Sequence, residues 1–109
     1  MPGWTAFSDE TEAQDRRVLR AAPGEGLRLV IRDLVISNNA AEGNIVFIED
    51  VEGTPVQVSP IYYLDAKANL PLHFKQPLYI SPNKSFGFTS VGFTTHGVEV
   101  RGCTRLTYP

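Results

Sequence analysis

The sequence predicts an all-β protein, an antiparallel two-sheet β-sandwich of jelly-roll type built from about eight short strands. Apolar and polar residues alternate with a period of two in short segments, which is typical of strands that bury one face. Turn residues such as Pro23-Gly24 and Ser81-Pro82 separate these segments, and no segment has the periodicity of a long helix. The chain has 109 residues, the usual length of one domain.

Residues 1–17 are expected to form an N-terminal arm that precedes the sandwich domain of residues 18–109. Two large apolar side chains, Trp4 and Phe7, stand there beside an acidic stretch from Asp9 to Asp15. Such a segment buries too little surface to order itself, but each aromatic side chain would gain on the order of a few kcal/mol by docking. Trp4 and Phe7 are therefore predicted to contact a partner; the alternative is a disordered tail.

The segment Leu27–Ser37 is predicted to be a long strand whose apolar side chains change parity halfway. Leu29 and Ile31 share one parity in the first half of the strand, and Leu34 and Ile36 share the other parity in the second half. We expect a bulge or bend near Arg32 and Asp33, because one extra residue lets a single strand serve two surfaces.

The next strand, Ile45–Ile48, is apolar on both parities. It is therefore either a central strand with both faces covered or part of a subunit interface. No helix is available to cover a second apolar face, and large apolar patches are rarely exposed on monomers. Val46 and Ile48 are accordingly predicted to contact further copies of the chain in a closed homo-oligomer.

Two prolines restrict the strands that follow. Pro60 argues against a continuous central strand through Tyr62 and Tyr63, since proline cannot donate to the ladder. Pro71 places the segment Leu70–Phe74 at the edge of a sheet for the same reason. Further short strands are expected over 16–22, 56–58, 77–80 and 86–88.

The last strand has the clearest alternation. One parity, expected to face the core, holds Val98, Val100, Thr104, Leu106 and Tyr108, and the other, expected to face water, holds Glu99, Arg101, Cys103, Arg105 and Thr107. The core of the sandwich is predicted to contain Leu29, Ile31, Leu34, Ile36, Phe47, Leu72, Phe86, Phe88, Val98 and Val100.

Composition and charge disfavour several classes of partner. The net charge of −2 gives no overall attraction for nucleic acid or anionic lipid, and neither partner is expected. No run of eighteen apolar residues and no secretion signal is recognised, so no membrane contact is expected. The single cysteine, Cys103, cannot form an internal disulfide, so the fold must be stabilised by packing, by assembly or by both.

The residue pattern does not indicate an enzyme. His73 and His96 lie in different segments, without the closely spaced ligands of a metal site. Cys103 lies on an outward parity of a regular strand, where nothing would lower its thiol pKa. The glycines are dispersed one or two per turn rather than in a phosphate loop. We therefore expect no catalytic residues, no metal and no cofactor.

Arginines supply most of the positive charge and cluster near the two ends of the chain. If the terminal strand pairs with an early strand, Arg101 and Arg105 would lie beside Arg17 or Arg28. Such a stripe could bind carboxylates of a partner, and Arg101 and Arg105 are predicted to do so. The alternative is an ordinary solvated face with weak cross-strand ion pairs.

Four stretches share a layout with a known group of proteins. They are APGEGLRLVIRDLVISN, GNIVFIEDVEG, LPLHFKQPLYISPNKSFGFTS and HGVEVRGCTRL, and the matching positions are Pro23, Gly24, Leu29, Ile31, Phe47, Pro77, Leu78, Phe88, Val98, Val100 and Gly102. In this layout a glycine turn precedes a long first strand, and a closing strand leads to a glycine. From Ala21 to Tyr108 the chain resembles small virion proteins of tailed bacteriophages, which include capsid decoration (cement) proteins and related head-fibre or tail-fibre modules.

The resemblance implies a non-enzymatic virion structural protein, made in the host cytoplasm and bound to the outside of a capsid as a decoration subunit. Its partners would be itself, as a homotrimer, and the major capsid protein or another virion protein. It would stabilise the lattice by burying surface, without a chemical step. The alternative is a receptor-binding or fibre module that binds cell-surface carbohydrate, which requires Tyr62, Tyr63 and Tyr79 to be exposed together.

Overall fold

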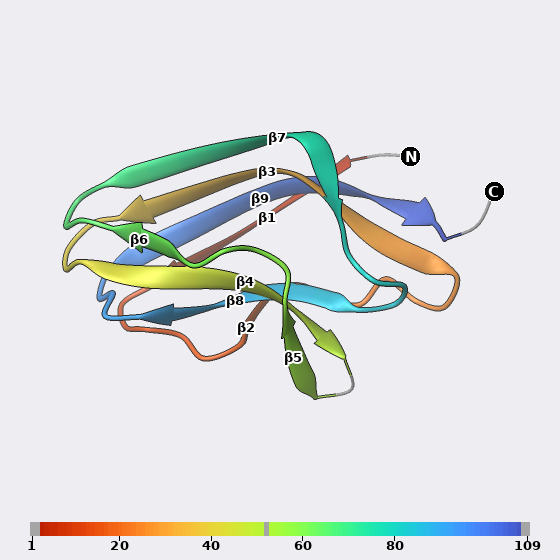
Figure 1. The fold of residues 1–109 in the computed structure, drawn as a ribbon, viewed down its shortest axis with the longest axis horizontal. Helices are drawn as coiled ribbons and strands as arrows, with labels where there is room; N and C mark the ends of the chain where they lie inside the picture. The colour runs from red at the N-terminus through yellow and green to blue at the C-terminus, as the bar shows by residue number, and fades with distance from the viewer. Residues whose placement is uncertain (1–2, 52, 108–109) are drawn as a thin grey trace.

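The structure is a computed structural model that describes residues 3–51 and 53–107. Within these residues nine strands form two antiparallel sheets that pack face to face (Figure 1). The first sheet has the order β1 (Gly3–Glu10), β9 (His96–Leu106), β3 (Leu27–Asn38) and β7 (Asn69–Tyr79). The second has the order β2 (Arg17–Arg20), β8 (Ser85–Val91), β4 (Gly43–Val51) and β5 (Thr54–Gln57), with β6 (Tyr62–Leu64) also paired to β4.

The pairing of the strands is that of a jelly roll. The first strand pairs with the last, β2 pairs with β8, β3 with β7, and β4 with β5 and β6. A long antiparallel ribbon with these pairs, rolled up once, gives two sheets packed face to face. The predicted fold is therefore confirmed, and the expected eight strands are recovered if β5 and β6 are taken as one interrupted strand.

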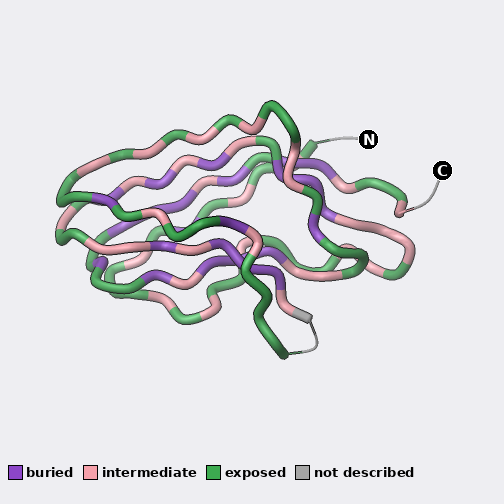
Figure 2. Tube along the Cα trace, viewed as in Figure 1, coloured by how far each residue is buried: buried purple, intermediate pink, exposed green. Residues whose placement is uncertain are grey.

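The core lies between the two sheets, as the inward band of buried residues in Figure 2 shows. Three phenylalanines form its centre, with the rings of Phe47 and Phe86 stacked at 5.6 Å and Phe88 tilted against Phe47 at 6.4 Å. Nine of the ten predicted core residues are buried, and the tenth, Leu72, is partly buried and packs against them. Ile45, Leu64, Ile80 and Phe93 complete the core and lie outside the prediction.

The bulge predicted in the long strand is confirmed. Ile31 lies opposite Gly102 of β9 and Asp33 lies opposite Arg101, so Arg32 has no residue opposite it. The register between β3 and β7 shifts at the same point, where residues 74–77 are left out of the ladder. The extra residue turns both halves of β3 toward the core, although their apolar side chains have opposite parity in the sequence.

Both proline predictions are confirmed as well. Pro71 lies in β7, which is an edge strand of the first sheet. Pro60 lies in the gap between β5 and β6. At this gap the backbone N–H of Phe47 donates to the hydroxyl of Ser59 at 2.9 Å, so a side chain replaces the missing ladder partner.

Residues 3–10 are part of the first sheet, and this corrects the expectation of an arm over residues 1–17. β1 pairs with β9 in unbroken register from Gly3 opposite Cys103 to Glu10 opposite His96. The pairing supplies backbone hydrogen bonds that composition does not reveal, and it lets Trp4 pack against the core. Met1 and Pro2, which begin the expected arm, lie outside the described residues.

The prediction that Cys103 faces water is wrong, because only 6% of its surface is exposed. It lies on the outward parity of β9, opposite Val30, which is itself fully buried. Leu106 lies on the inward parity but is 59% exposed. Neighbouring strands and the end of the sandwich set the exposure of these residues, which parity alone does not specify. Tyr108 lies outside the described residues.

Candidate functional site

The outer face of the first sheet presents residues from four strands in regular register. The register places twelve of its outward residues in three rows that cross β1, β9, β3 and β7 in turn. The rows are Thr5, Arg101, Asp33 and His73; Phe7, Glu99, Val35 and Pro71; and Asp9, Gly97, Ser37 and Asn69. We call these twelve residues the outer face.

A shallow hollow runs across the middle of the outer face. It is lined by Phe7, Asp9, Val35, Ser37, Gly97 and Glu99, and a second hollow beside it shares Val35 and Glu99. Gly97 forms part of its floor because it has no side chain, and a Cβ there would come within 2.7 Å of the Asp9 carboxylate. Phe7 stands beside the hollow with 75% of its surface exposed.

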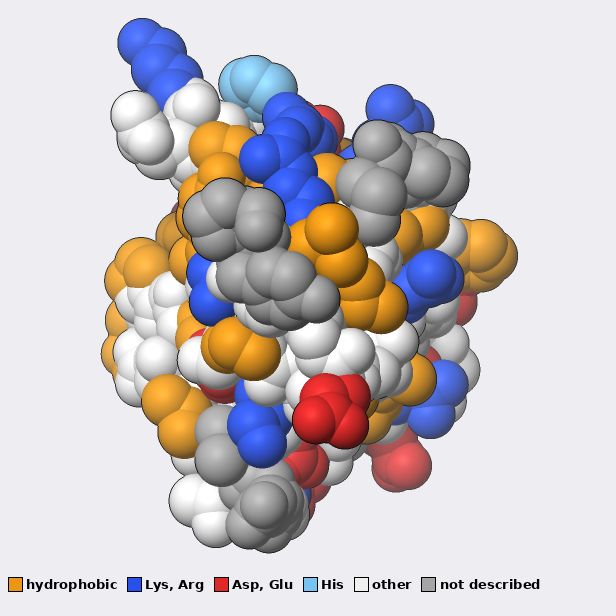
Figure 3. All heavy atoms as spheres, turned by 90° about the vertical axis from the view of Figure 1, so that its right-hand side faces the viewer, with side chains coloured by type: hydrophobic (Ala, Val, Ile, Leu, Met, Phe, Trp, Pro, Cys, Tyr) orange, Lys and Arg blue, Asp and Glu red, His pale blue; other side chains and the backbone are white. Residues whose placement is uncertain are grey.

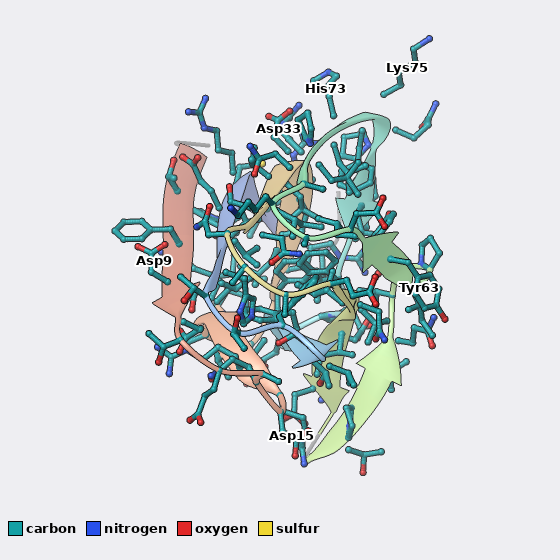
Figure 4. All side chains as sticks on the ribbon, turned by 90° about the vertical axis from the view of Figure 1, so that its left-hand side faces the viewer. Asp9, Asp15, Asp33, Tyr63, His73 and Lys75 are labelled. Atoms are coloured by element: carbon teal, nitrogen blue, oxygen red, sulfur yellow. The ribbon has the colours of Figure 1, made fainter. Side chains whose placement is uncertain are left out.

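Two pairs of polar side chains lie close together on the outer face. The imidazole of His73 lies 2.5 Å from a carboxylate oxygen of Asp33, and the two side chains point toward each other (Figure 4). Arg101 lies 3.7 Å from Glu99. Exposed pairs of this kind contribute little stability, so their effect is to fix the positions of polar atoms. Lys and Arg side chains also gather beside a His at one rim of the molecule (Figure 3).

A serine and a histidine meet in the interior, between β8 and β9. Ser90 Oγ lies 3.0 Å from Nε2 of His96, whose Nδ1 donates to the carbonyl oxygen of Thr94 at 2.7 Å. The backbone N–H of Gln14 donates to the same serine oxygen at 2.9 Å. Ser90 and His96 are 3% and 1% exposed, so no substrate can reach them, and the pair anchors the segment before β2 to the sheet.

The structure separates the six residues predicted to contact a partner. Trp4 and Phe7 lie on opposite faces of β1: Trp4 packs against the core with the Arg20 guanidinium 4.7 Å from its ring, and Phe7 is exposed. Arg101 and Arg105 are exposed on β9.

The expected neighbourhood of the two arginines is found in part. Arg105 lies directly opposite Arg28 of β3, as the stripe required. Arg101 lies opposite Asp33 instead, and Arg17 belongs to the other sheet. Arg101 therefore faces an acidic residue on the neighbouring strand, whereas Arg105 faces a second arginine.

Val46 and Ile48 lie on the outward parity of β4 in the second sheet. Ile48 is only 7% exposed within the single chain, and Val46 is half-buried. A small crevice beside Ile48 is lined by Arg16, Val18 and Asp50, with Arg16 Nη2 donating to Asp50 Oδ2 at 2.8 Å. Ile48 is therefore covered within the single chain, which fits the alternative of a central strand with both faces covered. Contact of Val46 and Ile48 with a second copy stays a prediction.

The three tyrosines do not form one aromatic platform. Tyr62 packs edge-on against Phe47 at 6.3 Å, and burial raises the pKa of its hydroxyl above the ordinary value of 10.0. Tyr63, the next residue of β6, is 76% exposed, while Tyr79 lies on β7 in the other sheet. The arrangement required for carbohydrate binding by these tyrosines is absent.

The hollow beside Phe7 was not predicted from the sequence, except for Phe7 itself. Its residues come from β1, β9 and β3, which are far apart in the sequence. Alternation over residues 3–10 indicates a strand. The register that brings Asp9, Gly97 and Ser37 into one row cannot be predicted from a local pattern.

The described residues contain no group of three or more His, Cys, Asp or Glu side chains placed to hold a metal ion. They also contain no helix with the length and apolarity to cross a membrane. A scan against protein-family models finds no match, and a search of curated proteins finds no significant match.

Proposed function

We propose that this protein is a non-enzymatic structural protein of a virion, a capsid decoration subunit that binds the outer surface of a capsid lattice. The observation that carries the proposal is the outer face: a broad, regular surface with an exposed aromatic side chain and ion-paired polar groups in fixed register. Such a face can bind another protein by burying surface against it, and an aromatic side chain can serve as the anchor that becomes buried in the contact.

The fold adds support by analogy. Jelly rolls with this strand order occur in viral capsid proteins as well as in lectins and cupins. The fold is therefore compatible with a virion protein but does not by itself assign that role. The resemblance of residues 21–108 to phage decoration proteins points the same way. In this proposal the subunit adds interface free energy to a lattice under internal pressure, and no bond is made or broken.

The test begins with purified virions. A copy number close to that of the major capsid protein supports a decoration subunit, whereas a few copies per particle support the fibre alternative. Absence from the particles contradicts both. The resemblance implies a trimer, and the number of copies at each lattice position of purified virions tests that stoichiometry.

A pair of variants tests the surface itself. Glu99→Arg changes the charge at the centre of the outer face and should weaken binding to particles that lack the subunit. Gln57→Arg on β5 of the other sheet is the matched control and should bind as the wild type does. Equal binding by both variants would contradict the assignment of the outer face.

One observation favours the carbohydrate alternative at a different place from the tyrosines. Phe7 stands beside a hollow that also contains the carboxylates of Asp9 and Glu99. Sugars stack on aromatic rings and donate hydroxyl hydrogen bonds to carboxylates, so this hollow has the right chemistry. Binding to a glycan array by the wild type, lost in Phe7→Ala, would support this alternative.

A further inference from the structure

The edges of the two sheets differ in how well they resist pairing with another chain. An edge strand exposes unpaired N–H and C=O groups, and proteins block such edges with prolines, lysines, bulges or short strands. Within the described residues the edge strands are β1 and β7 in the first sheet, and β2 with the interrupted strand β5 and β6 in the second.

Three of these edges carry blocking features. β7 contains Pro71, Pro77 and Lys75, and its register breaks between the two prolines. β2 and β5 have four residues each; β2 has a register shift, and β5 contains Pro55. β6 has three residues. Each of these strands offers at most a few consecutive backbone groups to another chain.

β1 is the exception. It has eight residues, contains no proline, lysine or arginine, and pairs with β9 without a register shift. Among the described residues no backbone hydrogen bond reaches its outer edge. The strand is therefore a regular template for one more strand, and Phe7 is 75% exposed beside that edge.

We propose that the free edge of β1 pairs with β1 of a second copy of this chain, antiparallel and about a two-fold axis at Phe7. The two four-stranded sheets then form one continuous sheet across the dimer. A two-fold contact requires a self-complementary sequence, and β1 is self-complementary in this register. This contact does not depend on the proposed virion function.

The register follows from side chains on the outer side of β1. With Phe7 opposite the partner's Phe7, Thr5 lies opposite the partner's Asp9, and Ala6 lies opposite the partner's Ser8. Aromatic pairs directly opposite each other stabilise a sheet, and Thr5 can donate a hydrogen bond to the carboxylate. A parallel arrangement in the same register would instead place Asp9 on the partner's Asp9, which is unfavourable.

On the inner side of β1, Trp4 comes to lie opposite the partner's Glu10. The Glu10 carboxylate is already engaged within its own chain, where it lies 3.4 Å from Arg17 and accepts a hydrogen bond from Ser8. The inner side therefore adds no new ion pair, and the register rests on the pairs of the outer side.

Light scattering on the full chain tests the inference with matched variants. The wild type is expected at the mass of two chains at micromolar concentration. Phe7→Lys should give the mass of one chain, because two lysines would lie opposite each other. Tyr63→Lys, with the same change at an equally exposed aromatic residue far from β1, should remain at two chains (Figure 4).

Two further measurements report on the edge without relying on Phe7→Lys. Amide hydrogen exchange of residues 3–10 should slow as the wild-type concentration rises, while exchange in β5 stays constant. In a Cys103→Ala background, Phe7→Cys should form a disulfide-linked dimer under mild oxidation and Tyr63→Cys should not.

A monomeric wild type, a mass of three chains, or a dimer that survives Phe7→Lys with unchanged exchange in β1 would overturn the two-fold contact. None of these outcomes bears on the presence of the protein in virions.

Discussion

Single residues in this fold matter most where they satisfy polar groups inside the sandwich. Ser90 accepts a hydrogen bond from the Gln14 backbone and bonds the His96 ring, and both side chains are buried. A buried donor or acceptor left without a partner costs more than an exposed one, because water cannot replace the lost bond. The hydroxyl of Ser90 therefore holds the chain before β2 onto β8.

We expect Ser90→Ala to lower the free energy of unfolding by about 2 kcal/mol, since two buried groups lose their partner. Denaturant unfolding followed by tryptophan fluorescence measures this change. Ser81→Ala, the same substitution at an exposed serine, is the control and should leave the unfolding midpoint unchanged. Equal midpoints for the two variants would show that Ser90 is not a structural anchor.

The pKa of Tyr62 leads to a prediction on alkaline stability. Burial raises this pKa above 10.0, the value expected in the unfolded chain, so folding favours the protonated hydroxyl. The corresponding stability is complete below pH 10.0 and is lost as the pH rises through the folded-state pKa. Between about pH 9 and about pH 11, Tyr62→Phe should lose less unfolding free energy than the wild type.

Tyr63→Phe is the matched control for this experiment, because Tyr63 is 76% exposed on the same strand. It should follow the wild-type pH profile. A Tyr62→Phe profile that coincides with the wild type would contradict a role of Tyr62 ionisation in alkaline unfolding.

At the scale of elements, the bulge in β3 decides whether one strand can serve both halves of the core. Leu29 and Ile31 face the core before the bulge, and Leu34 and Ile36 face it afterwards. Arg32 is the inserted residue and is exposed. Its presence in the chain matters for register, whereas its side chain does not.

Deletion of Arg32 should therefore unfold the domain or leave it far less stable, because one half of β3 would turn its apolar side chains toward solvent. Arg32→Ala keeps the residue count and should change the unfolding free energy by less than about 0.5 kcal/mol. Circular dichroism during thermal unfolding compares the two. A deletion variant as stable as Arg32→Ala would mean that β3 can shift its register freely.

At the scale of the whole molecule, β1 is an edge strand of the first sheet and not a separate arm. It covers the edge of β9 over eight paired residues and brings Trp4 against the core. Removing it would expose both a long strand edge and apolar side chains, which favours aggregation as well as unfolding.

Deletion of Met1 to Glu10 should therefore lower the thermal midpoint and reduce solubility. Differential scanning calorimetry and sedimentation at several concentrations would measure both effects. Phe7→Ser, which keeps the strand and changes only an exposed side chain, is the control and should fold as the wild type does. A truncated protein as stable as this control would restore the view of the segment as a separate arm.

Local sequence patterns are enough to predict the fold class, the bulge near Arg32, the edge position of Pro71 and most of the core. These features depend on the period of the apolar pattern and on the backbone restrictions of proline, which act over a few residues. Local chemistry is therefore enough to specify them.

Local patterns do not predict the place of β1, the burial of Cys103 and Ile48, or the rows of the outer face, which become visible in the folded chain. Each depends on which strands become neighbours and in what register, so the residues that determine it are far apart in the chain. Cys103 does lie on the outward parity that the sequence predicts, but side chains of other strands set its exposure and that of Ile48. Pairing between distant strands is a property of the assembled sheets, and no short stretch of sequence encodes it.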